Sequence, residues 1–185
     1  ALREARRLGA KILSIVNVVG SSIARESDDV LYTWAGPEIA VATTKAYSTQ
    51  LVLLDMLGVY FAKVCGSISD AEYEEIVEEL LALPVKMEAV IEDIDEIKYL
   101  ASRYFNHNSI FFIGRNLDYA LGLEGSLKLK EISYIHSEAY ASGELKHGTI
   151  SLIEDGTLVV ALGTYKPLFE KTLSNIIEVK ARGAD

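Results

Sequence analysis

The hydrophobic positions of this sequence form short continuous runs that alternate with longer helical segments. Four runs predict strands, and the first is expected to be buried on both faces of a sheet. They are "KILSIVNVV" (11–19), "DVLYTWA" (29–35), "SIFFIGR" (109–115) and "TLVVALG" (157–163). Helices are expected between and after them, including a long one from about Lys45 to Cys65. Strands that alternate with helices indicate an α/β fold class, with parallel sheets and right-handed crossovers.

An acidic, almost wholly helical stretch separates the first two strands from the last two. It begins near Ser69, a suitable N-cap, and contains Pro84, which should kink or break the helix. We interpret it as a connector between two α/β parts. The predicted domains are therefore residues 1–66, a helical connector over 67–100, and residues 101–185.

The two ends of the chain resemble each other. "EARRLGAK" (4–11) and "EVKARGAD" (178–185) each close a basic helix with glycine and alanine. A predicted strand follows the first copy, whereas the chain stops after the second. We interpret the two as copies of one α/β unit, the first without its beginning and the second without its end, and expect the chain to be a fragment.

Composition narrows the function classes. The formal net charge is −9, which argues against nucleic acid as the main partner because phosphate backbones need basic patches. The single cysteine, Cys65, cannot form an internal disulfide and is expected to be a buried, inert thiol. Asp55 and Lys63 interrupt the longest apolar stretch, which favours a core helix over a membrane span. No signal peptide is recognised, so a cytoplasmic location is expected.

The segment "LEGSLKLKEISYIHSEAYASGELKHG" (123–148) concentrates charged and titratable residues. Glu124, Lys128 and Glu131 stand at i, i+4 and i+7 and should form one stripe on a helix. A stripe of this kind is often an ordinary solvated surface, stabilised by about 0.2–0.5 kcal/mol per ion pair. Here, leucine and isoleucine residues flank it on both sides, and the polar arc that includes Ser126 lies opposite. The charges should therefore be paired or line a cleft.

This arrangement suggests acid–base chemistry. Glu124 offers a partner for Lys128, which leaves Glu131 as the carboxylate best able to act as a general base. Lys146 and His147 lie between two glycines, and His147 is a plausible acid–base group near neutral pH. His136 and His147 are too far apart in sequence to suggest a metal site, and neither a dinucleotide fingerprint nor a P-loop is present, so no cofactor is expected.

Three segments resemble one known family. The segment at 123–148, "NVVGSSIARESD" (17–28) and "AGPEIAVATTKAYSTQL" (35–51) are similar to the isomerase domains of glutamine–fructose-6-phosphate aminotransferases (glucosamine-6-phosphate synthases). These domains are built from two sugar isomerase (SIS) domains. The resemblance runs over nearly the whole chain and implies parallel sheets flanked by helices in a Rossmann-like, three-layer arrangement.

The resemblance also implies roles for individual residues. Glu131 matches the base that moves a proton between C1 and C2 of the open-chain sugar. Lys128 and His147 match residues that assist ring opening, with His147 supplied to the neighbouring subunit of a homodimer. Val41 and Thr43 match positions that contact substrate, although Thr43 is commonly serine in the family. A Thr here could also simply cap the next helix, and the two roles are compatible.

Fructose 6-phosphate, with ammonia from glutamine, is the substrate that the resemblance implies, and glucosamine 6-phosphate the product. The family's phosphate loop, its C-terminal lysine and its glutaminase domain match nothing in this chain, so we expect the chain alone not to carry out the full reaction. Two alternatives stay open: another SIS-domain sugar-phosphate deglycase or isomerase, and a non-catalytic SIS module that binds a sugar phosphate for regulation.

Overall fold

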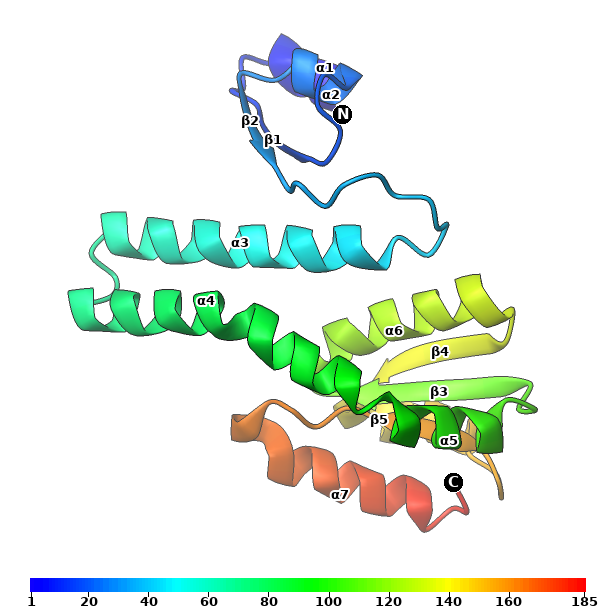
Figure 1. Ribbon diagram of the computed structural model, residues 1–185. Coiled ribbons are helices and arrows are strands. Elements are labelled where there is room, and N and C mark those ends of the chain that lie inside the picture. Colours follow the sequence, from blue (N-terminus) through cyan, green and yellow to red (C-terminus); the bar gives the residue numbers. More distant parts are fainter. The chain divides into compact units, whose positions relative to one another are not determined.

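The computed structural model describes residues 1–185, which form two compact units, residues 1–93 and 94–185. The first unit contains a small parallel sheet and two long helices (Figure 1). Its elements are α1 (Leu2–Arg7), β1 (Leu13–Val16), α2 (Ser22–Arg25), β2 (Asp29–Tyr32), α3 (Thr44–Val64) and α4 (Asp70–Glu92). The second unit is a parallel three-stranded sheet with helices. It contains α5 (Ile94–Tyr104), β3 (Ser109–Gly114), α6 (Leu117–Ser133), β4 (His136–Ala141), η1 (Ser142–His147), η2 (Thr149–Leu152), β5 (Leu158–Ala161), η3 (Lys166–Leu168) and α7 (Phe169–Lys180).

In the first unit, β1 and β2 pair in parallel, with Leu13 opposite Asp29 and Val16 opposite Tyr32. Both strands were expected from their apolar runs. The expected burial of the first run on both faces is wrong, since Leu13 is 49% exposed and Val18 64% exposed. A sheet of two short strands has too little surface to cover both faces of its own residues.

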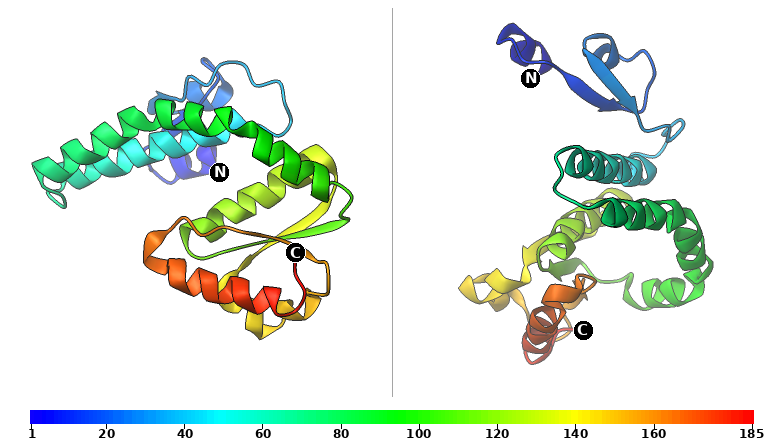
Figure 2. Two further views of the ribbon diagram at one scale, coloured as in Figure 1. Left: turned by 60° about the horizontal axis from the view of Figure 1, so that its bottom comes forward. Right: turned by 90° about the vertical axis from the view of Figure 1, so that its left-hand side faces the viewer.

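The long helices of the first unit lie side by side (Figures 1 and 2). Ser69 caps α4 as expected, in a capping box in which its hydroxyl accepts the Glu72 backbone N–H and the Glu72 carboxylate accepts the Ser69 N–H. Pro84 lies inside α4, which bends along its course but continues to Glu92 (Figure 1).

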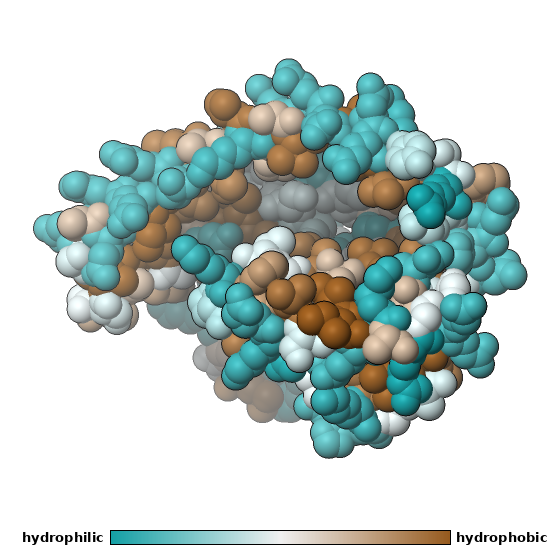
Figure 3. Space-filling model, turned by 90° about the horizontal axis from the view of Figure 1, so that it is seen from below, coloured by the Kyte–Doolittle hydropathy of each residue, from teal (hydrophilic) through white to brown (hydrophobic).

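Two predictions about α3 are wrong. No residue of α3 is buried, so it is not a core helix of the described chain. Cys65, which caps its C-terminus, is exposed and not buried. The apolar residues of both long helices are open at the surface, and the face drawn in Figure 3 likewise shows hydrophobic atoms among hydrophilic ones. None of the helices is both long enough and apolar enough to span a membrane.

The sheet of the second unit has the strand order β4-β3-β5, with all neighbours parallel. β3, β5 and α7 confirm the predicted α/β pattern. β4 was not expected, because "HSEAYA" alternates polar and small residues and contains no apolar run. The helix α6 covers one face of the sheet, and α7 lies on the other (Figure 1), which gives this unit three layers.

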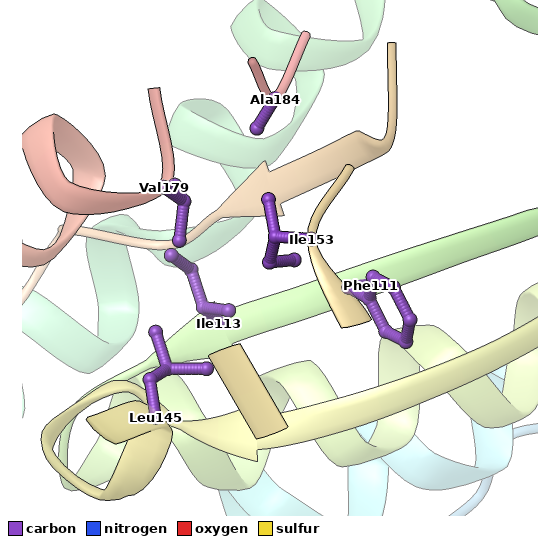
Figure 4. Packing of buried hydrophobic residues seen from close by; sticks show 6 residues of the cluster. All are labelled: Phe111, Ile113, Leu145, Ile153, Val179 and Ala184. Carbon is purple, nitrogen blue, oxygen red and sulfur yellow. The ribbon is translucent and has the colours of Figure 1, made fainter. Parts of the chain in front are cut away.

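Buried side chains between the sheet and α7 form the main hydrophobic core. They come from β3, from the segment that follows β4, from the end of α7 and from the C-terminal segment after it (Figure 4): Phe111, Ile113, Leu145, Ile153, Val179 and Ala184. Ile113 and Leu145 are each only 1% exposed. Phe111 and Ile113 of the central strand therefore lie on the α7 side of the sheet.

Small residues form the contact between α6 and the opposite face of the sheet. Gly125 lies so close to the Phe112 ring that an added Cβ would stand 3.1 Å from it. Ser126 is 2% exposed and exchanges hydrogen bonds with Ser137 of β4, with 2.9 Å between the two hydroxyl oxygens. The expectation that Ser126 lies on an outer polar arc is therefore wrong. Its hydroxyl is satisfied within the contact, so a buried polar group costs little there.

The two similar chain ends fold in the same way. The N–H of Gly9 donates to the Arg6 carbonyl and that of Ala10 to the Ala5 carbonyl. Gly183 and Ala184 repeat both bonds, to the carbonyls of Lys180 and Val179. Both glycines have a positive φ, +84° for Gly9 and +91° for Gly183, which only glycine adopts without strain. The sequence similarity thus extends to backbone geometry.

One buried carboxylate fixes the start of α6. Asp118 is 2% exposed, and its oxygens accept hydrogen bonds from the Thr164 hydroxyl at 2.5 Å and from the Tyr165 backbone N–H at 3.0 Å. Burial raises the pKa of Asp118, but these hydrogen bonds outweigh burial and hold the pKa below its usual value. Asp118 therefore connects α6 to the segment after β5.

We expect the substitution Asp118→Asn to destabilise the chain at neutral pH by about 1–3 kcal/mol, because an amide cannot reproduce two charge-assisted acceptor bonds. The pKa of Asp118 is lower in the folded chain than its unfolded value of about 3.9, so its contribution is present above that pH and is lost as the pH falls through the folded pKa. The measurement is the free energy of unfolding in urea of the original chain and of Asp118→Asn at several pH values.

Asp95→Asn is the matched control, since the side chain of Asp95 is 94% exposed. It should change the free energy of unfolding by no more than about 0.5 kcal/mol at every pH. If Asp118→Asn were as mild as this control at pH 7, the buried carboxylate would not hold the two segments together.

Candidate functional site

The charged stripe of α6 is a linked set of ion pairs. The Nζ of Lys128 lies 2.7 Å from Oε2 of Glu131 and 3.4 Å from Oε1 of Glu124. The three side chains are largely withdrawn from solvent, with 19% exposure for Lys128 and Glu124 and 26% for Glu131. The ammonium group therefore holds one carboxylate on the preceding turn of the helix and one on the following turn.

The stripe lies on the side of α6 that is turned away from its own sheet. At about 100° per residue, Glu124, Lys128 and Glu131 stand about 120–180° around the helix from Gly122, which is buried against the sheet. Exposed leucines share the outward side, with Leu121 45% and Leu127 42% exposed. As the sequence indicated, the charges interrupt an apolar surface, but this surface is not the one that packs on the sheet.

The ion pairs differ from the predicted pairing in one respect. Glu124 was expected as the partner of Lys128, with Glu131 as the carboxylate best able to act as a general base, yet Glu131 is the closer of the two carboxylates. The hydrogen bond from Lys128 to Glu131 is the main reason why the pKa of Lys128 is raised. Burial of the ammonium opposes this rise, and the interaction with Glu124 adds to it. Lys128 is thus a firmly protonated cation that already contacts the proposed base.

His147 is not close to this stripe within the second unit. It ends η1, which follows the carboxyl end of β4, whereas Lys128 and Glu131 lie near the end of α6, just before β4 begins. A six-residue strand spans about 16 Å, so the two places are at opposite edges of the sheet. The His147 side chain is 77% exposed, and its Nε2 lies 3.8 Å from Glu144. The neighbouring Lys146 pairs with Glu178 at 2.9 Å.

The predicted substrate-contacting residues lie in the first unit, just before α3. Val41 is 85% exposed. Thr43 has a left-handed backbone with φ of +53°, and its hydroxyl donates to the Val41 carbonyl at 2.7 Å. It stands at the N-cap position of α3 but makes no side-chain cap hydrogen bond. The expectation that a Thr side chain caps this helix is therefore wrong. The strained backbone is typical of functional segments.

Sequence reasoning passed over a second polar group, at the carboxyl edge of the sheet. Arg115 directly follows β3, and both Nε and Nη2 of its guanidinium donate to Oδ1 of Asn175, at 3.0 and 2.8 Å. Sixty residues separate the two, so no local pattern connects them. The only available signal was an arginine immediately after a buried strand. No cluster of three or more His, Cys, Asp or Glu side chains is arranged to hold a metal ion.

Comparisons with known proteins agree with these features. A sequence profile of the SIS domain family matches residues 1–60 and 103–185. The chain is 60% identical over 184 residues to the glutamine–fructose-6-phosphate aminotransferase (isomerizing) of Clostridium tetani and 48% identical over 182 residues to that of Thermus thermophilus. The first alignment covers 100% of this chain and the second 98%, but each covers only 30% of the relative, so the chain spans about a third of the length of these relatives.

Solved structures give the same result. The C-terminal domain of glucosamine-fructose-6-phosphate aminotransferase from Francisella tularensis superposes with a TM-score of 0.95 and is 41% identical, covering 100% of this chain and 52% of that one. A glucosamine-6-phosphate deaminase from Thermotoga maritima has a TM-score of 0.67 and 28% identity, over 94% of this chain and 50% of that one. Fold, sequence profile and relatives agree, and the chain belongs to the SIS domain family.

Proposed function

We propose that this chain is the part of a glucosamine-6-phosphate synthase that carries its sugar isomerase helix. The reaction is the conversion of fructose 6-phosphate, with ammonia from glutamine, into glucosamine 6-phosphate. One observation carries the proposal: a lysine on α6 is held between two carboxylates that are largely withdrawn from water. The 60% identity to the glutamine–fructose-6-phosphate aminotransferase (isomerizing) of Clostridium tetani supports it.

The residue types suit the isomerisation step. Glu131 takes a proton from one of the two reacting carbons of the open-chain sugar and returns it to the other, which is general acid–base catalysis. Negative charge develops on the sugar oxygen during the transfer, and the Lys128 ammonium is a fixed positive group one turn away that stabilises it. Glu124 acts as a positioning residue, since its carboxylate keeps the ammonium on this side of the helix. Val41 and Thr43 contact the sugar phosphate.

His147 completes the site from a second copy of the chain. Within one copy it lies at the other edge of the sheet from Glu131, so a site that uses both residues needs another subunit. The exposed imidazole is accessible to a partner surface. We therefore propose a homodimer. A cytoplasmic location also stays a prediction, supported by the lone cysteine.

The deaminase-like alternative has one observation in its favour, the 28% identity to the Thermotoga maritima protein. It is the weaker candidate, because identity to the aminotransferases is about twice as high over the whole chain. The two functions differ in their need for glutamine as the source of nitrogen. A deaminase would release ammonia from glucosamine 6-phosphate and would not respond to glutamine.

The role of Glu131 is tested in a chimera in which this chain replaces the matching segment of the Clostridium tetani aminotransferase. We expect the chimera to make glucosamine 6-phosphate from fructose 6-phosphate and glutamine. Glu131→Gln should lower kcat by about 10²–10⁴-fold, because the amide cannot accept the proton. Glu96→Gln, the same change at an exposed position of α5, should leave kcat unchanged. Full activity of the Glu131→Gln chimera would remove this residue from the mechanism.

The shared site is tested by mixing two inactive chimeras. A Glu131→Gln subunit still supplies His147, and a His147→Ala subunit still supplies Glu131. If each site takes one residue from each subunit, mixed dimers contain one intact site, and up to about half of the wild-type activity per mixed dimer should return. Activity is measured after subunit exchange at equal concentrations. A mixture no more active than its components would contradict the sharing of His147.

The ion-pair geometry predicts an unequal effect of the two carboxylates on Lys128. The pKa of Lys128 is raised above its unfolded value of about 10.4, so the pairs stabilise the fold below that pH, and this contribution is lost as the pH rises through the folded pKa. Glu131→Gln should lower the pKa of Lys128 more than Glu124→Gln does, as measured by NMR titration of its Cε. Equal effects would show that Glu131 is not the closer partner.

A further inference from the structure

A small pocket opens at the carboxyl edge of the sheet in the second unit, on the α7 side. Its volume is about 240 Å³, and its lining comes from the end of β3, from η1 and from one face of α7: Arg115, Gly143, Lys146, Lys171, Ser174, Asn175 and Glu178. In open parallel sheets, ligands bind outside the carboxyl ends of the strands. The pocket has that position and shares no residue with the stripe on α6.

The guanidinium of Arg115 is held in a fixed orientation in this pocket. Nε and Nη2 both donate to Oδ1 of Asn175, which is 5% exposed and donates in turn to Glu178 at 3.2 Å. Gly143 leaves room for the remaining nitrogen, since a Cβ there would stand 3.1 Å from Nη1. The cation is thus partnered by a neutral amide and keeps donors on Nη1 for a further acceptor.

The charges around the pocket do not cancel. Three cations line it, Arg115, Lys146 and Lys171, against the single carboxylate of Glu178. Glu178 pairs with Lys146, with 2.9 Å between Nζ and Oε1, whereas Lys171 makes no ion pair. The pocket is thus locally positive, although the net charge of the chain is −9. A local positive charge of this kind attracts anions even though the protein as a whole is negative.

We propose that this pocket is a second binding site, for a phosphate-type oxyanion, separate from the isomerase stripe. The Nη1 edge of Arg115 donates to one oxygen, Lys171 neutralises the charge, and the Ser174 hydroxyl is available as a further donor. A rigid guanidinium fork beside a flexible ammonium is a combination that recognises phosphate. The size of the pocket suits a free phosphate ion or the phosphate end of a small metabolite rather than a nucleotide.

The test is a titration of the ¹⁵N-labelled chain with inorganic phosphate and, separately, with fructose 6-phosphate, followed through the Arg115 Nε–H resonance. Fructose without phosphate is the negative probe. Both phosphate compounds should shift this resonance, and added salt should weaken their binding. Stronger binding of fructose 6-phosphate would identify a metabolite site, and equal binding a site for the phosphate group itself. If neither phosphate moves the Arg115 resonance, the proposal is wrong.

Two variants and a matched control separate this site from general charge effects. Lys171→Gln should weaken phosphate binding about three- to tenfold, and Lys180→Gln, the same change further along α7 and outside the pocket, should not. Glu178→Gln removes the only carboxylate and should strengthen binding. Equal weakening by Lys171→Gln and Lys180→Gln, or weaker binding by Glu178→Gln, would overturn the proposal. Glu131→Gln should leave this binding unchanged, so the result does not depend on the isomerase proposal.

Discussion

The close contact between α6 and its sheet determines what the rest of this helix can do. Glycine and serine fill the contact, with Gly125 against the Phe112 ring and Ser126 bonded to Ser137. Because small residues fill this contact, Glu124, Lys128 and Glu131 lie on the opposite side of the helix, away from the sheet. The ion pairs around Lys128 therefore form among exposed leucines.

In the same unit, buried or half-buried polar side chains near the start of α6 hold neighbouring elements together. Asp118 joins the start of α6 to the segment after β5, and Arg115, just before α6, joins the end of β3 to α7 through Asn175. Each bond joins a helix to the segment that follows a strand of the sheet. A rigid edge of this kind holds side chains in place for binding, since well-supported groups lose less freedom when a ligand arrives. The stripe on α6 thus lies at one edge of this framework, and the exposed His147 and the basic pocket lie at the other.

Local patterns predicted most elements of the fold but not how they pack. The apolar runs at 109–115 and 157–163 indicated β3 and β5 correctly, because buried parallel strands are nearly continuous in hydrophobic residues. β4 lacks such a run, and Ser126 has no apolar character to indicate that it faces the sheet. In the candidate site, helical spacing indicated the stripe, but it could not decide which carboxylate lies nearer Lys128. Contacts such as that of Asp118 with Thr164 join residues 46 positions apart, which no periodicity reveals.

The two glycine closures have a consequence for the tolerance of the chain to substitution. Gly9 and Gly183 make the same backbone bonds, but their surroundings differ. A Cβ on Gly9 would meet nothing within 4 Å, whereas one on Gly183 would stand 2.7 Å from a carboxylate oxygen of Asp155 and 2.8 Å from its Cα. At Gly9, replacing glycine by another residue costs only the strain of the left-handed backbone, about 1–2 kcal/mol. At Gly183, the new side chain would also displace the turn before β5. The helix ends at Gly9 and Gly183 share one backbone geometry, but the first tolerates substitution of its glycine better than the second.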